Sequence, residues 1–215
     1  MQLLSINRAI ATDITLGNKT VATGIFKKPT QETVVIGRLG VAGDTIVDTK
    51  VHGGEDQAVY LYSAEDYAWW SEQLDRELPA GTFGENLTIM SFHDGVLRVG
   101  DRLQIGESLL LEITAPRVPC AKFAAKMGDA SFVKAFIRAG RPGAYARVLQ
   151  IGSVTKGDAL KWQPTEQNYI DIKGMFYQWH QKAWDKAALH QALGSPLSKI
   201  ARRIISKRAG IADSG

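Results

Sequence analysis

Cysteine is almost absent from this chain of 215 residues, in which Cys120 is the single example. One thiol excludes an internal disulfide and an iron–sulfur cluster, and one cysteine with one histidine would fall short of the four ligands of a zinc site, or three plus water. The chain also lacks an apolar run near 18 residues and a charged-then-apolar leader after Met1, so neither a membrane span nor a secretory signal is predicted. We therefore expect a cytoplasmic protein, because a reduced thiol is stable there.

The region before Pro164 has the pattern of a mainly β domain. Short alternating apolar runs, separated by Gly-Asp turns, predict strands at residues 3–6, 33–36, 58–62, 95–99, 103–105, 109–113 and 144–151. Many short strands of this kind are typical of a barrel. We expect a β-barrel domain over residues 1–163.

Two helices are predicted to interrupt these strands. Ser63, with Asp66 three residues later, has the signature of a capping box and begins the first helix. Asp129 is the expected N-cap of the second helix, which Gly140 ends.

The tail, residues 164–215, is predicted to form a small three-helix domain. Its expected helices cover residues 172–179, 184–193 and a stretch behind Ser195-Pro196, where apolar residues recur at helical spacing. The tail has eight Lys+Arg against four Asp+Glu, which accounts for the whole net charge of +4. A basic helix could bind nucleic acid, but without aromatic interleaving this is the less favoured interpretation, and a docking or packing module is favoured.

Cys120 follows a predicted strand in the segment Ala115-Pro-Arg-Val-Pro-Cys120. Its prolines fix the backbone, and the positive charges of Arg117, Lys122 and Lys126 are expected to lower the pKa of a nearby thiol. A thiolate here could act as a nucleophile, a redox group or a soft metal ligand. The alternative is a buried structural cysteine, the commoner fate of a lone thiol.

Two small-residue loops form the other candidate cluster. Lys50-Val-His-Gly-Gly-Glu55-Asp56 places His52, Glu55 and Asp56 around the Gly53-Gly54 pair, directly before a predicted strand. Such glycines permit positive φ and let backbone amides approach an anion. The loop from Pro79 to Asn86 has the same character. The alternative is that the glycines form an ordinary turn and that His52 is a structural histidine.

Taken together, these segments resemble the MOSC domain proteins (molybdenum cofactor sulfurase C-terminal), and specifically their stand-alone YiiM-like branch. The matching motifs, in family order, are Thr23-Gly-Ile-Phe-Lys27, Gly40-Val-Ala-Gly43-Asp44, Val51-His-Gly-Gly-Glu-Asp-Gln-Ala-Val59, Gly81-Thr-Phe-Gly-Glu-Asn-Leu-Thr88, Val99-Gly-Asp101, Pro116-Arg-Val-Pro-Cys120 and Gly143-Ala-Tyr-Ala-Arg-Val148. The helical tail is similar to the small domain that follows the barrel in this branch. Because every motif precedes residue 149, we expect the barrel to bind its cofactor without residues 165–215.

The resemblance implies a molybdenum cofactor held in a cleft of the barrel, with Cys120 as the protein ligand to the metal. It implies that the anionic end of the cofactor meets Arg117, Lys50 and the backbone amides of the two glycine loops. Asn86 is expected to hydrogen-bond the pterin edge through both amide functions. The full cofactor-binding set expected on this basis is Lys50, His52, Gly53, Gly54, Phe83, Gly84, Glu85, Asn86, Arg117 and Cys120.

The activity implied by the resemblance is reduction of N-hydroxylated compounds, such as hydroxylamino-purine bases, to amines. His52, Glu55 and Asp56 are the unranked candidates for the proton donor, with Cys120 at the metal. A flavoprotein is expected to supply electrons, because the chain has no Gly-x-Gly-x-x-Gly fingerprint and no further cysteines. The alternative function is non-catalytic, with Cys120 carrying the cofactor or a persulfide sulfur for delivery elsewhere.

Overall fold

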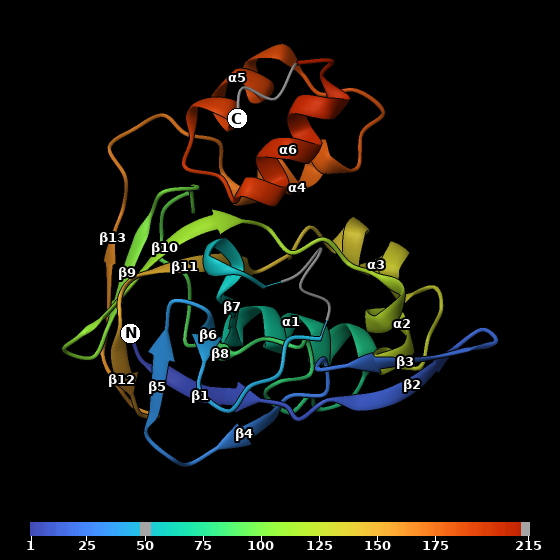
Figure 1. Ribbon diagram of the computed structural model, residues 1–215, viewed down its shortest axis with the longest axis vertical. Coiled ribbons are helices and arrows are strands. Elements are labelled where there is room, and N and C mark those ends of the chain that lie inside the picture. The colour runs from blue at the N-terminus through green and yellow to red at the C-terminus, as the bar shows by residue number, and fades with distance from the viewer. Residues whose placement is uncertain (48–52, 212–215) are drawn as a thin grey trace.

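The computed structural model describes residues 1–47 and 53–211 (Figure 1). Its strands are β1 (Leu3–Arg8), β2 (Thr12–Leu16), β3 (Lys19–Thr23), β4 (Lys28–Thr30), β5 (Val34–Gly37), β6 (Gly40–Val41), β7 (Val59–Ser63), β8 (Leu87–Ile89), β9 (Arg102–Ile105), β10 (Leu109–Ala115), β11 (Ala144–Gln150), β12 (Gly152–Val154) and β13 (Leu160–Gln163). Its helices are η1 (Glu55–Gln57, a 3-10 turn), α1 (Ala64–Leu74), α2 (Ala121–Met127), α3 (Phe132–Ala139), α4 (Ile172–Trp179), α5 (Lys186–Gly194) and α6 (Lys199–Arg208).

Within the described residues, eight strands form one curved sheet in the order β13-β9-β10-β11-β7-β8-β1-β4 (Figure 1). The β7–β8 pair is parallel, and the other pairs are antiparallel. The domain is rich in strands as expected, but the predicted barrel is not closed. Its edge strands β13 and β4 do not pair with each other. The start of β1 does meet the start of β13, through the bridge Gln2–Ala159 and backbone hydrogen bonds such as that from Leu3 N to Asp158 O (2.9 Å).

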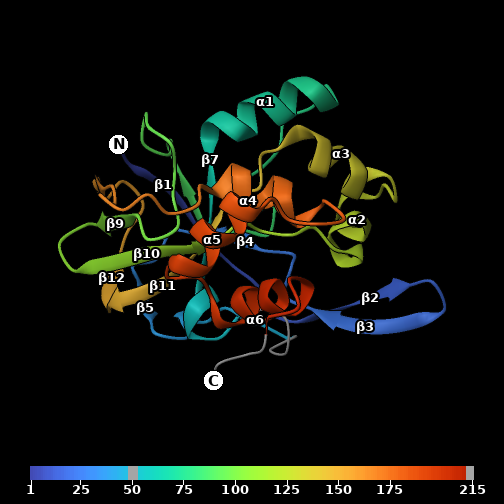
Figure 2. The same cartoon turned by 90° about the horizontal axis from the view of Figure 1, so that it is seen from above.

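Two smaller sheets accompany the main one. The first has the order β12-β5-β6, and the second is the β2–β3 hairpin, which projects from the body of the molecule (Figure 2). The hairpin has no counterpart among the predicted strands. Thr23 is its one buried residue, so the contrast between a buried and an exposed face that marks a strand in sequence is weak in this hairpin.

The local capping predictions have mixed outcomes. The Ser63 hydroxyl accepts a hydrogen bond from Asp66 N (3.1 Å) and caps α1 as predicted. The N-cap prediction for Asp129 is wrong, because α3 starts after Ser131 and the Asp129 carboxylate binds Ser131 instead. The strand predicted at residues 95–99 is absent, since its Arg98 makes only an isolated bridge to Asp171.

The interior contains an aliphatic and an aromatic cluster. The aliphatic cluster lies along the main sheet and includes Leu3, Leu61, Leu103 and Ile113. The aromatic cluster lies between α1, α2 and α3, where Phe83 stacks on Tyr62 at a ring-centroid distance of 4.3 Å. The aromatic side chains fill the volume behind the segment that carries Cys120, and so fix where that segment runs.

The described tail consists of three helices that form a layer above the main sheet (Figure 1). Asp171 and Ser198 cap α4 and α6 through hydrogen bonds to Gly174 N and Ala201 N. Apolar tail residues join the aliphatic cluster of the sheet, among them Met175, Leu197 and Ile205. The three predicted helices are therefore present, but they share their core with the sheet. No helix in the described part of the chain is long and apolar enough to cross a membrane.

Candidate functional site

A hollow opens where loops from both halves of the main sheet meet the start of α2. Its volume of about 680 Å³ includes open solvent at its mouth, so the hollow is open on one side. The lining residues are Thr23, Gly24, Ile25, Lys27, Thr45, Ile46, Val47, Gly53, Gln57, Tyr60, Gly84, Asn86, Arg117, Cys120, Lys122 and Tyr145.

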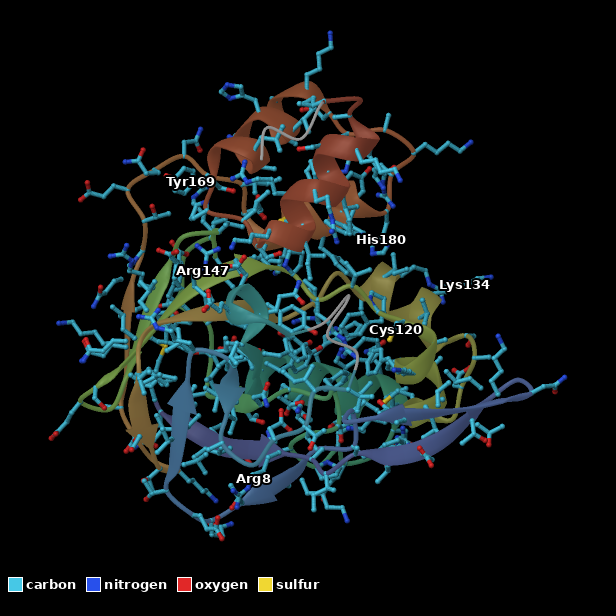
Figure 3. All side chains as sticks on the ribbon, viewed as in Figure 1. Arg8, Cys120, Lys134, Arg147, Tyr169 and His180 are labelled. Carbon is cyan, nitrogen blue, oxygen red and sulfur yellow. The ribbon has the colours of Figure 1, made fainter. Side chains whose placement is uncertain are left out.

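Cys120 lies on the wall of this hollow, at the N-cap position of α2 (Figure 3). The chain reaches it from the end of β10 through Pro116 and Pro119, whose rings restrict φ and hold the segment extended. Cys120 is partly exposed. A sulfur in this position is accessible to a ligand and is held by a rigid backbone.

Arg117 is the most deeply placed cation of the lining, with 5% of its surface exposed. Its Nη1 donates to the carbonyl oxygen of Phe83, and its guanidinium carbon lies 4.0 Å from the centroid of the Phe123 ring. Burial by itself lowers the pKa of Arg117, but nearby Tyr60, Tyr145 and Cys120 outweigh it, so the net shift is upward. Arg117 therefore brings a permanent positive charge to the floor of the hollow beside Cys120.

Two lysines of the lining add positive charge. Lys27 is almost buried and forms an ion pair with Asp44, while Lys122 is partly exposed beside Cys120. Burial lowers the pKa of Lys27, and the Asp44 carboxylate opposes that shift. The lining thus has cations on several sides, an arrangement that suits an anionic ligand.

Lys126 lies behind the hollow and holds two of its loops together. Its Nζ donates to the carbonyl oxygen of Ile25 (2.7 Å) and to that of Gly81. Burial lowers the pKa of Lys126 to about 8. Lys126 was expected only as a charge near the thiol, and the structure uses it to tie the loops of the hollow to α2.

Gly53 and Gly84 form part of the wall, and both have a φ of 75°. A Cβ on Gly53 would lie 2.8 Å from a methyl carbon of Ile46, and a Cβ on Gly84 would lie 2.9 Å from a side-chain carbon of Ile25. Only glycine fits these two positions without local rearrangement. Gly54 also has a positive φ but is exposed and does not line the hollow.

Asn86 reaches the hollow, but its amide is already used within the protein. The Oδ1 atom accepts from Tyr60 N (3.2 Å), and Nδ2 donates to Asp44 Oδ2 (2.8 Å). Both amide functions of Asn86 thus have partners within the protein and hold β7 and the ion-paired Asp44 in place, and the expected contact with a pterin stays a prediction.

Glu85 and Phe83 also have structural positions. Glu85 is fully buried, and its Oε1 accepts from Gly81 N, the Tyr67 hydroxyl and the Thr88 hydroxyl, each at 2.7 Å. Phe83 is fully buried in the aromatic cluster and contributes its carbonyl to Arg117. Neither residue lines the hollow, so the expectation that their side chains contact a cofactor is not supported.

The residues expected to donate a proton are not brought together. Glu55 is exposed and outside the lining, and the carboxylate of Asp56 is occupied on the tail side by Lys199 N (2.9 Å) and by Arg147 Nε (3.0 Å). The Asp56 carboxylate is therefore engaged on the tail side and is not part of the lining of the hollow. Lys50 and His52 lie outside the described residues, so their expected roles stay predictions.

Sequence reasoning missed several residues of the lining, notably Lys27, Gln57, Tyr60 and Tyr145. Lys27 ends the Thr23–Lys27 motif, and Gln57 follows Asp56 in the Gly-Gly motif, so both lie in segments already singled out. Their side-chain directions have no signature in sequence. In the described residues no three His, Cys, Asp or Glu side chains cluster as a metal site, and the lining offers a metal one sulfur, that of Cys120.

The chain is similar in sequence to known proteins. The chain is 36% identical to the protein YflK of Bacillus subtilis over 171 residues, covering 80% of this chain and 77% of YflK. It is 27% identical to YiiM of Escherichia coli over 81% of this chain and 79% of YiiM. It is also 32% identical to a protein of Gibberella moniliformis named "Reductase", covering 65% of this chain but 25% of that longer protein.

Solved structures share the fold. The crystal structure of YiiM from Geobacillus stearothermophilus matches with a TM-score of 0.78 at 29% identity, covering 96% of this chain and 98% of that one. The crystal structure of YiiM from Escherichia coli matches with a TM-score of 0.71. The model of the MOSC domain matches residues 48–161, which include Gly53, Asn86, Arg117 and Cys120. The chain therefore belongs to the MOSC domain family and is a YiiM-like member of it.

Proposed function

We propose that this protein is a molybdenum-cofactor-dependent reductase of N-hydroxylated compounds, with hydroxylamino-purine bases as a representative substrate class. The overall reaction converts R–NH–OH, two electrons and two protons to R–NH₂ and water. The partly exposed thiol of Cys120 beside a cationic hollow is the observation that carries the proposal. The relative from Gibberella moniliformis that is named a reductase supports the oxidoreductase class.

The residues of the hollow fit this cofactor in three respects. Cys120 offers a soft thiolate, the ligand type that molybdenum accepts beside its dithiolene sulfurs. Arg117 and Lys122 offer positive charge for the phosphate of the pterin, whereas the charge of Lys27 is paired with Asp44. The wall at Gly53 and Gly84 has backbone conformations that suit close approach of a ligand to the main chain.

When bound, the cofactor supplies a metal centre that exchanges two electrons and an oxygen atom with the substrate. The residues of the chain would hold the cofactor in place. Cys120 would be a ligand to the metal, Arg117 would supply a fixed positive charge, and Lys126 connects two loops of the wall. Ile25 and Ile46 give part of the lining an apolar surface.

Protons and electrons must reach the site from elsewhere in the chain or from a partner. Asp56 is engaged by its ion pair, and Glu55 is exposed and outside the lining, so His52 is our proposed proton donor among the three candidates. A flavoprotein remains the proposed electron donor. The basic tail, with Lys199, Arg203 and Lys207 on α6, suits an acidic docking surface on that partner.

The second candidate function is a non-catalytic carrier of the cofactor, or of a persulfide sulfur on Cys120. It would use the same thiol and the same cationic hollow. Turnover separates the two functions, because a carrier does not reduce an N-hydroxylated base.

The test uses full-length protein from a host that makes the cofactor. Molybdenum per chain is measured by elemental analysis, and reduction of 6-hydroxylaminopurine is followed with a chemical reductant. We expect nearly stoichiometric molybdenum and multiple turnovers in the wild-type protein. We expect no turnover in Cys120→Ser. Bound molybdenum with no turnover would favour the carrier, and protein without molybdenum would refute both cofactor functions.

A further inference from the structure

Gln57 has a buried polar atom that the protein leaves without a partner. The residue is 9% exposed and lines the hollow. Its Oε1 atom is inaccessible to solvent and has no hydrogen-bond partner among the described residues. An unpaired buried acceptor is destabilising, and native proteins rarely retain one without a compensating role.

The backbone that carries Gln57 is held on both sides, so this orientation is built in. Gln57 N donates to Gly54 O (3.2 Å), and the Thr114 hydroxyl donates to the carbonyl oxygen of Asp56 (2.6 Å). The Asp56 carboxylate is fixed by Arg147 and by Lys199 N. A side chain on such a short, anchored turn is preorganised toward its ligand.

The polarity of Gln57 is opposite to that of its charged neighbours in the hollow. Arg117 and Lys122 are donors and suit the anionic end of a ligand, whereas a carboxamide oxygen needs an N–H or O–H donor. Asn86, the other carboxamide of the lining, uses its amide within the protein. Gln57 is therefore the lining carboxamide with an acceptor still to be paired.

We propose that Gln57 Oε1 accepts a hydrogen bond from an N–H group of a heterocycle bound in the hollow, and so selects ligands that carry such a donor. The inference rests on the proposed function for the identity of the heterocycle. Two sources share the required chemistry: the pterin ring of the cofactor and the purine ring of the substrate. Both carry ring or exocyclic N–H groups.

Two substitutions test this role. Gln57→Met keeps the length of the side chain and removes its acceptor, whereas Gln57→Glu keeps an acceptor and removes the donor of the carboxamide. The matched control is Gln163→Met, at an exposed position on β13 outside the hollow. Because Met removes an unpaired buried oxygen, ligand-free Gln57→Met should unfold at the same or a higher urea concentration than wild type.

The first experiment needs neither metal nor turnover. Molybdenum-free wild type and variants are titrated by calorimetry with pterin and, separately, with 6-hydroxylaminopurine. We expect at least one of the two compounds to bind Gln57→Met about 2- to 10-fold more weakly than wild type, the effect of one neutral hydrogen bond. Gln57→Glu should recover most of that loss, and Gln163→Met should match wild type.

The second experiment assigns the source in the cofactor-loaded protein. If the partner is the pterin, Gln57→Met lowers molybdenum content and leaves KM for the base unchanged. If the partner is the substrate, molybdenum content is unchanged and KM rises about 2- to 10-fold.

The inference is overturned if both compounds bind Gln57→Met as tightly as wild type, if neither binds wild type, or if Gln57→Glu is as weak as Gln57→Met. Wild-type protein without molybdenum or turnover would refute the proposed reductase function but not the role of Gln57. The titrations would still decide whether Gln57 binds a heterocycle.

Discussion

Asp56 and Gln57 are adjacent in the chain and serve different parts of the molecule. Asp56 accepts from Lys199 N at 2.9 Å, at the start of α6, whereas Gln57 lines the hollow that contains Cys120. Figure 3 shows Arg147, the second partner of Asp56, on the side of the sheet that faces the tail. The 3-10 turn η1 therefore joins the tail to the hollow through two consecutive residues.

The first prediction concerns this junction. Asp56→Asn should lower the free energy of unfolding by about 1–3 kcal/mol, because Arg147 keeps a partly buried charge with one partner fewer. Urea unfolding measures the change, with Asp13→Asn on the exposed β2 as the control. An unchanged urea midpoint in Asp56→Asn would mean that the ion pair does not anchor η1.

The second prediction revises the expected independence of the tail. Removal of residues 164–215 takes Met175, Leu197 and Ile205 out of a hydrophobic cluster that they share with the sheet. We expect the shortened protein to be less soluble, to unfold at lower urea and to bind less molybdenum per chain, since η1 loses its contact with α6. Wild-type molybdenum content in soluble shortened protein would restore the original expectation that the tail is separable.

The third prediction concerns Cys120. Cys120→Ser should abolish N-hydroxyl reduction, because a serine oxygen is hard and poorly ionised where the metal needs a thiolate. Circular dichroism and urea unfolding should match wild type, since the side chain is partly exposed and changes by one atom. Retained turnover in this variant would end the assignment of Cys120 as the metal ligand.

The fourth prediction separates charge from packing in the hollow. Arg117→Ala should lower both molybdenum content and stability, the latter by about 2–4 kcal/mol, because the guanidinium also binds Phe83 O and covers the Phe123 ring. Lys122→Ala removes a partly exposed charge from the same lining and should lower molybdenum content with little loss of stability. Equal metal content in wild type and both variants would contradict the cationic cradle.

The fifth prediction concerns pH. Burial lowers the pKa of Lys126 from 10.5 to about 8, so between these values the unfolded chain binds more protons at this site than the folded chain. The contribution of Lys126 to the free energy of unfolding should therefore rise as the pH increases from about 8 to 10.5, by at most about 3 kcal/mol. Lys126→Met should remove this rise in urea midpoint, and Lys134→Met, on the exposed side of α3, should keep it.

Local features of this protein could be predicted from sequence because their causes lie within a few residues. The Ser63 cap, the end of α3 at Gly140 and the helix at residues 172–179 depend on side chains near the backbone groups they satisfy. The spacing of the family motifs pointed to the Gly-Gly loop and to the Cys120 segment as parts of one site, and Gly53 and Cys120 do line one hollow.

Tertiary structure decided which hydrogen-bond and ion-pair partners the polar side chains have. Asn86 and Asp56 both lie in motifs suited to a ligand. Long-range packing instead brings Asp44 and Tyr60 to Asn86. It brings Arg147 and the start of α6 to Asp56. The open edge of the sheet likewise depends on which strands meet, and no local pattern encodes that. The sequence alone determined which segments carry reactive groups. Whether a polar side chain faces the ligand or the protein was decided by packing, because a buried donor or acceptor takes whichever partner the fold brings within reach.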